Sequence, residues 1–209
     1  DKNLIPILKD TLAEFDNVEI INQDVLKTDL NQIIAESGCR EAKIIGNLPY
    51  YITTPIIMGI LESNTHADSI TIMMQKEVAD RIKAGPGSKT YGALSVAVQY
   101  YCEVETVAIV PKEVFFPAPK VDSAVLKLVI RKEKPVELID EKMFFRCIKA
   151  GFGQRRKTLS NSLMGIGDVT KEQVKACLET LGIDEKRRAE TLSLEEFANV
   201  ANYFSKGEK

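Results

Sequence analysis

The stretch Ala42-Lys43-Ile44-Ile45-Gly46-Asn47-Leu48-Pro49-Tyr50 carries the strongest signal for the fold and for a functional site. Its first half is apolar and predicts a buried strand, and open α/β sheets bind their ligands where such strands end. Asn47 then offers a side-chain oxygen, and Leu48 offers a backbone carbonyl. Pro49 restricts the residue before it to extended geometry, and Tyr50 can stack on a base taken out of its helix. The alternative is a proline turn that only closes a strand.

An exocyclic amine on a flat ring would suit this arrangement. The amine of adenine is a poor nucleophile because its lone pair is delocalised into the purine. Acceptors that favour a more tetrahedral nitrogen would make it more reactive, and an amide oxygen and a backbone carbonyl are such acceptors. The stretch therefore suggests chemistry on an amine. The rest of the chain must decide between this interpretation and a proline turn that only closes a strand.

Composition indicates a globular protein with a substantial core. The 209 residues are 44% hydrophobic and 28% charged, which suits one large domain or one domain with a small partner. No apolar run approaches the roughly 20 residues needed to span a bilayer, and residues 1–3 carry no signal-peptide pattern. We therefore expect a cytoplasmic protein without membrane contacts.

The cysteines and the single histidine point to no metal site. Cys39, Cys102, Cys147 and Cys177 lie far apart without a C-x-x-C spacing. Neither a zinc site nor a disulfide framework is indicated, and we expect ordinary buried thiols. His66 sits in a polar stretch, so we expect a solvated loop residue rather than a catalytic base.

Positive charge is concentrated locally, although the formal net charge is -2. No acidic residue occurs from Lys142 to Gly167, a range that holds six basic residues. A weaker cluster of five basic residues falls within 112–132, against only Glu113 and Asp122. Such clusters suit phosphate-backbone binding, because each cation placed against a phosphate releases a condensed counterion. For any one of these residues alone, a solvated helix face is the simpler explanation.

Apolar spacing in the first part of the chain follows a βα pattern. It predicts helices at 4–12, 30–35, 54–61, 77–83 and 92–101, and strands at 18–21, 43–46 and 69–74. That alternation implies a mostly parallel sheet covered by helices. Two further strands, 105–110 and 123–130, could form an antiparallel hairpin on one sheet edge. Residues 85–88 follow a helix and predict a loop rather than a phosphate cradle.

A charged segment with a proline, residues 131–135, predicts a linker. Everything beyond it has a helical pattern. We therefore expect a catalytic α/β domain at 1–132 and a small all-helical domain at 133–209.

The helical part carries the basic block on one face. Apolar residues between 144 and 152 share one side of a helix, and Lys142, Arg146 and Lys149 share the opposite side. Thr170 and Ser193 each begin a capping-box pattern ahead of a further helix. The basic stripe should therefore face outward.

Four motifs occur in the order expected of one known family. They are Asn47–Tyr50, Gln75–Arg81, Phe115–Val125 and Phe152–Leu159. With them the chain closely resembles the ribosomal RNA adenine dimethyltransferases of the KsgA family, from Asp1 almost to the C-terminus. The resemblance implies a Rossmann-like methyltransferase sheet. It also implies S-adenosylmethionine-dependent N6,N6-dimethylation of two adjacent adenosines near the 3′ end of 16S-type small-subunit rRNA, during ribosome biogenesis.

The resemblance assigns catalytic roles to five residues. Asn47 and the carbonyl of Leu48 match the positions that hold the target amine, and Pro49 belongs to the same motif. Tyr50 matches the aromatic that stacks on the flipped base, and Phe115 matches one that flanks its other side. Apart from the resemblance, Phe115 would be read as a core residue.

The resemblance also assigns a cofactor contact. Asp24 matches the residue that contacts the adenine of S-adenosylmethionine, and Asn47 is expected beside the cofactor as well. Apart from the resemblance, Asp24 would be read as a turn or helix cap. Family members carry a Gly-rich cofactor loop and an acidic ribose-binding residue upstream of the segment present here. We therefore expect an N-terminally truncated chain that binds the cofactor weakly or not at all and is inactive.

Six basic residues are expected to contact RNA. Arg155, Arg156 and Lys157 match a basic element that the resemblance associates with RNA, in agreement with the charge pattern. The others are Lys120, Arg146 and Lys149. The expected partner is small-subunit rRNA in an immature 30S-type subunit, bound by a monomer without a metal ion.

Three other functions stay open. A large-subunit rRNA adenine methyltransferase that confers antibiotic resistance shares the Asn-Leu-Pro-Tyr chemistry, although the motifs at 115–125 and 152–159 favour the small-subunit enzyme. A DNA adenine methyltransferase is a second alternative, but such enzymes commonly have Pro in place of Leu48, so this chain fits that class less well. A non-catalytic ribosome-assembly factor would keep the basic helix without methylating, and the intact Asn47 and Tyr50 argue against it for the natural full-length protein.

Overall fold

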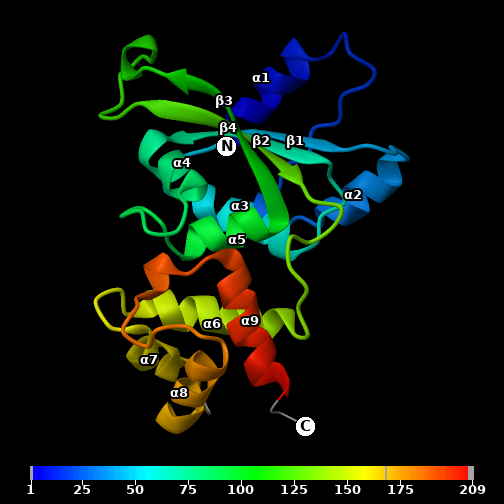
Figure 1. The fold of residues 1–209 in the computed structure, drawn as a ribbon. Helices are drawn as coiled ribbons and strands as arrows, with labels where there is room; N and C mark the ends of the chain where they lie inside the picture. The colour runs from blue at the N-terminus through cyan, green and yellow to red at the C-terminus, as the bar shows by residue number, and fades with distance from the viewer. Residues whose placement is uncertain (1, 168, 207–209) are drawn as a thin grey trace. The chain divides into compact units, whose positions relative to one another are not determined.

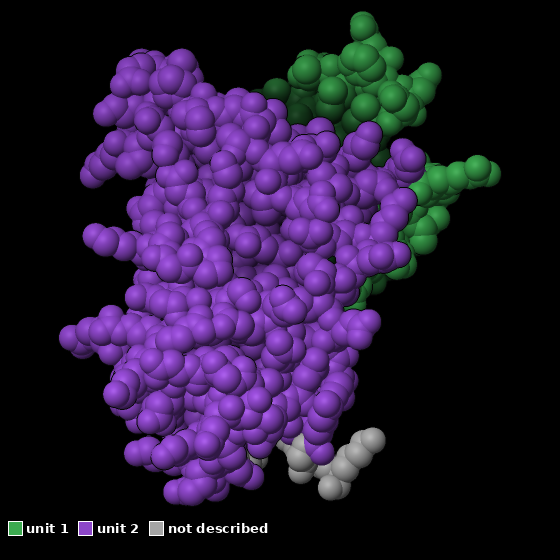
Figure 2. Space-filling view, viewed as in Figure 1, with its two compact units in different colours: residues 1–40, 54–66 green, residues 41–53, 67–209 purple. Residues whose placement is uncertain are grey.

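The computed structural model describes residues 2–167 and 169–206. The chain divides into two compact units, one of residues 1–40 and 54–66 and one of residues 41–53 and 67–209 (Figure 2). Each unit is held by its own internal contacts. None of the helices in the described ranges combines the length and apolar character that a bilayer crossing requires.

The first unit is built from short helices. It contains α1 (Leu4–Thr11), the 3-10 helix η1 (Val25–Lys27), α2 (Leu30–Ser37) and most of α3 (Thr53–Glu62). Asn31 joins α2 to the segment after α3, because its amide donates to the Ser63 carbonyl over 3.3 Å and its Oδ1 accepts the His66 N–H over 2.8 Å. His66 is exposed, as predicted for a loop residue.

The predicted strand at 18–21 is wrong. These residues form no strand, and three of the four are exposed. A strand needs a neighbour for its backbone hydrogen bonds, and the four strands in the described ranges pair only with one another. Strand propensity depends on such packing, so β-branched residues alone could not decide the matter.

The second unit contains a four-stranded sheet of order β1-β2-β4-β3. The strands are β1 (Lys43–Asn47), β2 (Ser69–Gln75), β3 (Cys102–Val110) and β4 (Ser123–Ile130). β1 and β2 are parallel, whereas β4 is antiparallel to both β2 and β3. The prediction of a mostly parallel sheet is therefore wrong for the strands described. The predicted antiparallel hairpin at a sheet edge is confirmed.

β1 is an edge strand rather than a buried one. It pairs only with β2, and the side chain of Ile45 is 83% exposed. Strands with one partner have fewer neighbours on both faces, so the apolar sequence of β1 did not guarantee burial.

Two helices cover one face of the sheet. α4 (Lys76–Lys83) contacts β2, β3 and β4, and α5 (Ala93–Tyr101) contacts β3 (Figure 1). Ile82 of α4 and Val98 of α5 are completely buried, as is Leu126 of β4. Burial of each such side chain contributes about 1.5–3 kcal/mol, so this layer is a main source of stability. Residues 85–88 form the predicted loop between the two helices.

The chain beyond residue 140 is helical, as predicted. It forms α6 (Glu141–Gly153), α7 (Leu159–Ser162), η3 (Leu163–Ile166), α8 (Lys171–Thr180), η4 (Ala189–Thr191) and α9 (Leu194–Lys206). The capping box at Thr170 is confirmed, since its Oγ1 accepts the Gln173 N–H over 3.3 Å and its own N–H donates to Gln173 Oε1 over 2.8 Å. Ser193 and Glu196 make the equivalent pair of bonds ahead of α9.

Tyrosines of α5 and of the loop before it join the helical region to the sheet layer. Tyr100 and Tyr101 donate to the Glu141 carboxylate over 2.9 Å and 2.7 Å. Tyr91 donates to the Leu192 carbonyl over 3.0 Å, and burial raises the pKa of Tyr91 to about 12, so its hydroxyl remains a donor at neutral pH. The expected domain boundary after residue 132 stays a prediction.

Three of the four thiols are buried, as predicted. They are Cys102, Cys147 and Cys177, and burial raises the pKa of each to about 12. Cys39 is exposed, contrary to prediction. It follows Gly38, which ends α2 with φ +68°, and the chain there runs over the surface.

Candidate active site

The loops that carry the predicted catalytic residues leave the same end of the sheet. Asn47, the last residue of β1, pairs with Met73 near the end of β2. Ser123, the first residue of β4, pairs with Gln75 on one side and with Val110 on the other. The carboxyl ends of β1, β2 and β3 therefore share one edge with the start of β4, and this is where such sheets bind ligands.

The chain turns sharply after Asn47. The Pro49 carbonyl accepts the Ile52 N–H over 3.1 Å and the hydroxyl of buried Thr53 over 3.2 Å. Leu48 folds back over Gly46, where a Cβ atom would lie 3.2 Å from Leu48 Cγ. The turn is thus fixed by its own bonds and by close packing at a glycine.

The Asn47 side chain is left available by this turn. It is exposed, and within the part of the chain that the structure describes it makes no hydrogen bond. Its amide oxygen can therefore accept a hydrogen bond from a ligand amine. Its role toward an adenine amine stays a prediction.

Tyr50 is anchored to the neighbouring part of the sheet. Its hydroxyl lies 2.7 Å from Oγ of Ser123, which is completely buried. β1 and β4 are separated by β2, a distance of about 10 Å at ~4.8 Å per strand. The turn after β1 therefore crosses the end of β2, and the anchored hydroxyl restricts how the Tyr50 ring can rotate.

Phe115 lies in the loop between β3 and β4. It follows the 3-10 helix η2 (Lys112–Val114), and its N–H donates to the Lys112 carbonyl over 3.3 Å. The side chain is half-buried, with an extended backbone. Phe115 thus leaves the same sheet end as Asn47, which agrees with the predicted role beside a flipped base without testing it.

Asp24 is a helix cap rather than a strand end. Its Oδ1 accepts the Leu26 N–H over 3.1 Å at the start of η1, and its carbonyl accepts the Thr28 hydroxyl over 2.9 Å. The residue is exposed, and Oδ2 remains for another donor. Asp24 and Asn47 belong to different units, so the predicted shared cofactor contact stays a prediction.

Two of the six predicted RNA-binding residues also hold the fold together. Arg155 Nη2 donates to the carbonyls of Lys89 and Tyr91 over 2.9 Å and 3.3 Å. The same atom lies 3.8 Å from a carboxylate oxygen of Glu190. Arg146 donates to the Ile166 carbonyl over 2.6 Å. Both side chains are therefore partly engaged with the protein.

The other four have free ammonium or guanidinium groups among the described residues. Lys120, Lys149, Arg156 and Lys157 are exposed and make no ion pair with any other described residue. Free, exposed cations are the groups that phosphate binding requires. RNA contact by these residues stays a prediction.

Two further cations lie beside Arg155 and were not expected from the sequence. Arg81 of α4 and Lys89 line, with Phe152 and Arg155, a cleft of about 500 Å³. Arg81 is within a motif that supports the family resemblance, but it pairs with Glu77 at 2.9 Å, so its charge is partly neutralised. Only the fold brings these residues to Arg155, since more than 60 positions separate them.

Comparison with protein families identifies the chain. The family model described as ribosomal RNA adenine dimethylase matches residues 1–206. The chain belongs to this family. It is 52% identical to ribosomal RNA small subunit methyltransferase A of Clostridioides difficile (strain 630), across 97% of this chain and 70% of the relative. It is 54% identical to the protein of the same name from Alkaliphilus metalliredigens (strain QYMF), across 96% of this chain and 70% of the relative.

Solved structures confirm the Rossmann-like methyltransferase fold of the family. A dimethyladenosine transferase from Plasmodium falciparum superposes with a TM-score of 0.82 at 23% identity, across all of this chain and 80% of that one. The 23S rRNA methyltransferase ErmE superposes with a TM-score of 0.69 at 24% identity, across 97% and 78%. At these identities the likeness concerns the fold alone.

Proposed function

We propose that this protein transfers methyl groups from S-adenosylmethionine to the N6 atoms of two adjacent adenosines near the 3′ end of small-subunit rRNA. The main supporting observation is the turn after Asn47. The Asn47 side chain, at the carboxyl end of β1, makes no hydrogen bond with another described residue, and Tyr50, three positions later, is anchored through its hydroxyl. Membership of the ribosomal RNA adenine dimethylase family supports the choice of base and reaction. The names of the relatives support the small subunit over the large one.

The protein's part in this reaction is to bind, orient and stabilise. S-adenosylmethionine supplies, when bound, a methyl group on a sulfonium. The N6 lone pair forms the new nitrogen–carbon bond as the carbon–sulfur bond breaks, and the nitrogen gains positive charge. Asn47 Oδ1 and the Leu48 carbonyl accept the amine hydrogens and so favour that charge. The methylated ammonium is acidic, and loss of its proton to water completes the step without a protein base.

The described residues fit only part of the cofactor. Asp24 Oδ2 can accept from an adenine amino group, and the neighbouring Val25 and Leu26 are partly exposed apolar side chains that can contact the ring. We propose that the 209 residues alone bind S-adenosylmethionine weakly. Titration calorimetry on this chain, with the longer Clostridioides difficile relative as positive control, tests this proposal, and equal affinities would contradict it.

Binding to purified ribosomal particles tests the choice of substrate. We expect the chain to bind immature small subunits in preference to large subunits. At high S-adenosylmethionine concentration, any methylation should map to two adjacent adenosines of the small-subunit RNA and should be lost in Asn47→Ala. Preference for large subunits would favour the alternative of a large-subunit rRNA adenine methyltransferase that confers antibiotic resistance. Unchanged methylation by Asn47→Ala would overturn the proposed site, and specific binding without methylation by the longer relative would favour a non-catalytic assembly factor.

A further inference from the structure

The most exposed aromatic side chain among the described residues lies next to the predicted base-flanking residue. Phe116 is 104% exposed, in the loop of residues 111–122 between β3 and β4. Phe115 before it is half-buried and has an extended backbone, with φ -97° and ψ 147°. Successive side chains on extended backbone point to opposite sides. One ring of the pair therefore faces the protein, and the other faces outward.

The loop that carries Phe116 is tied to the sheet at both ends. Asp122 Oδ1 accepts the Lys112 N–H over 3.1 Å, and the Asp122 carbonyl accepts the Lys76 N–H over 2.9 Å. Ser123, the next residue, holds the Tyr50 hydroxyl. These bonds position the loop, and with it the exposed ring, at the sheet end that carries Asn47 and Tyr50.

Two lysines on the same loop form no ion pair with another described residue. Lys112 and Lys120 line a cleft of about 380 Å³ together with Lys76 and Asp80. Asp80 is paired with Lys76 at 2.6 Å, and Oδ1 of Asp122 accepts the backbone N–H of Lys112. Among the described residues, neither Lys112 nor Lys120 forms an ion pair. Within the part of the chain that the structure describes, the loop thus presents one exposed ring and two lysines that form no ion pair, alongside the carboxylates of Glu113 and Asp122.

An exposed ring with adjacent cations is the combination that binds single-stranded nucleic acid. Aromatic rings stack on bases, and lysines follow the phosphates. We propose that Phe116 stacks on the nucleotide next to the target adenosine, with Lys112 and Lys120 on the adjoining phosphates. This inference rests on the proposed function and adds to it a second contact, outside the amine-binding turn. The contact would hold the neighbouring base while the target adenosine occupies the site.

A fluorescent oligoribonucleotide tests the stacking directly. The probe is a short single-stranded RNA with two adjacent adenosines and 2-aminopurine beside them. We expect the 209-residue chain to quench the 2-aminopurine on binding. Phe116→Ala should weaken binding about 5- to 150-fold, the range that loss of one stacked base gives. Val114→Ala, at a 66% exposed position of the same loop, is the matched control and should change affinity less than twofold.

Two further variants separate stacking from other roles. Phe116→Trp should keep both quenching and affinity, whereas Phe116→Leu should lose both, because only an aromatic ring stacks. If Leu performs as well as Trp, the side chain acts without stacking on a base and the inference is wrong. Replacing Lys112 and Lys120 with Ala should lower the slope of log affinity against log salt by about 1.4, since each phosphate on a single strand contributes about 0.7. An unchanged slope would show that Lys112 and Lys120 do not contact the phosphates.

The outcomes also separate this inference from the proposed function. If the unaltered chain binds neither the probe nor immature small subunits, the proposed function fails and the inference fails with it. If the unaltered chain binds both and Phe116→Ala binds equally well, only the inference fails.

Discussion

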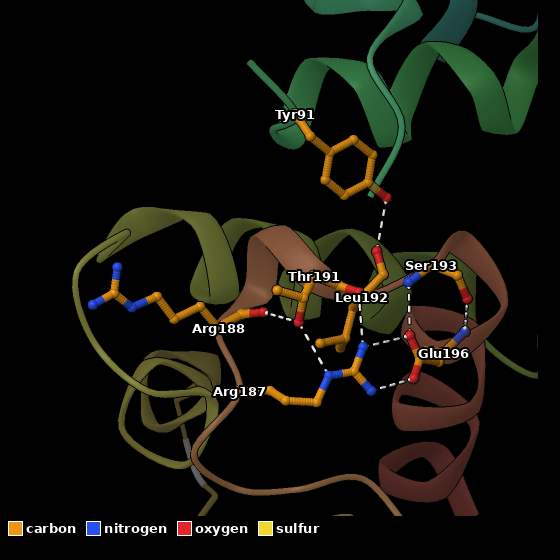
Figure 3. A network of polar contacts seen from close by, with 7 residues as sticks. All are labelled: Tyr91, Arg187, Arg188, Thr191, Leu192, Ser193 and Glu196. Atoms are coloured by element: carbon orange, nitrogen blue, oxygen red, sulfur yellow. Dashed lines mark hydrogen bonds and ion pairs between the residues drawn. The ribbon is translucent and has the colours of Figure 1, made fainter. Parts of the chain in front are cut away.

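The Arg187–Glu196 ion pair should stabilise the loop that joins η4 to α9. Nη1 and Nη2 of Arg187 donate to the two carboxylate oxygens of Glu196 over 2.5 Å and 3.0 Å (Figure 3). Glu196 Oε2 also accepts the Ser193 N–H over 2.8 Å, which closes the capping box of α9. The same loop supplies the carbonyl of Leu192 that Tyr91 binds. The pair therefore supports the contact between the helical region and the layer below the sheet.

Glu196→Gln should cost about 2 kcal/mol of unfolding free energy. The side chains of Arg187 and Glu196 are 31% and 30% exposed, which places the pair between two limits. An exposed pair contributes about 0–1 kcal/mol, and breaking a buried one costs about 3–5 kcal/mol. Gln keeps one acceptor oxygen, so a value near the middle is expected. With a denaturant slope of about 2–3 kcal/mol/M, the urea midpoint should fall by about 0.7–1 M.

The loss of stability in Glu196→Gln should be smaller at acidic pH than at neutral pH. The hydrogen bonds from Arg187 hold the pKa of Glu196 below its usual value in the folded protein. Stabilisation is therefore complete above the unfolded pKa, about 4.3, and is lost as pH falls through the lower folded pKa. The difference in stability between wild type and Glu196→Gln should be full at pH 7 and should shrink as pH falls below about 4.

Urea titrations of wild type and Glu196→Gln at pH 7 and near pH 3.5 provide the measurement. Glu77→Gln is the matched control, because Glu77 pairs with Arg81 at 2.9 Å but is 77% exposed. It should change stability by less than about 0.5 kcal/mol. The reasoning is refuted if Glu77→Gln and Glu196→Gln have equal effects, or if the difference for Glu196→Gln is the same at both pH values.

Three further predictions concern the site and the surface. Tyr50→Phe should lower stability by about 1–2 kcal/mol, because it leaves the buried Ser123 hydroxyl without its partner, and adding Ser123→Ala should recover most of this loss in thermal unfolding. Arg155→Ala should reduce both RNA affinity and stability, whereas Arg156→Ala should reduce only RNA affinity, as measured by filter binding and urea titration. Cys39 alone should react with a thiol reagent at pH 8 in the folded protein, because burial raises the pKa of the other three thiols, and mass spectrometry will count the modified sites.

Local patterns predicted the helical region well, because its signals act within a few residues. The capping residues Thr170 and Ser193 bond to groups three positions away, and the structure confirms both. The outward face of α6 follows from helical spacing alone, and Lys149 is exposed as expected. Short-range hydrogen bonds and periodicity are readable from sequence because no distant partner is needed to make them.

Strand direction and strand burial were less predictable, because both depend on distant partners. The sequence predicted a mostly parallel sheet with an antiparallel hairpin at one edge. The hairpin is confirmed, but its second strand, β4, lies between β2 and β3 and is antiparallel to both. Residues 18–21 have the composition of a strand, but no described strand pairs with them. Composition can indicate that a segment is able to form a strand, whereas the neighbouring strand decides whether it does.

The candidate site combines both kinds of information. The turn at Pro49 was readable from the sequence, since proline restricts its predecessor and the bonds to Ile52 and Thr53 are local. The anchor from Tyr50 to Ser123 was not, because 73 positions separate the two residues. That anchor depends on β4 beginning at the sheet end where β1 and β2 finish, and hence on the antiparallel pairing of β4 with β2, which the sequence pattern did not predict. The same strand direction places the loop of Phe115 and Phe116 at this edge, so the part of the fold that was hardest to predict is the part that assembles the site.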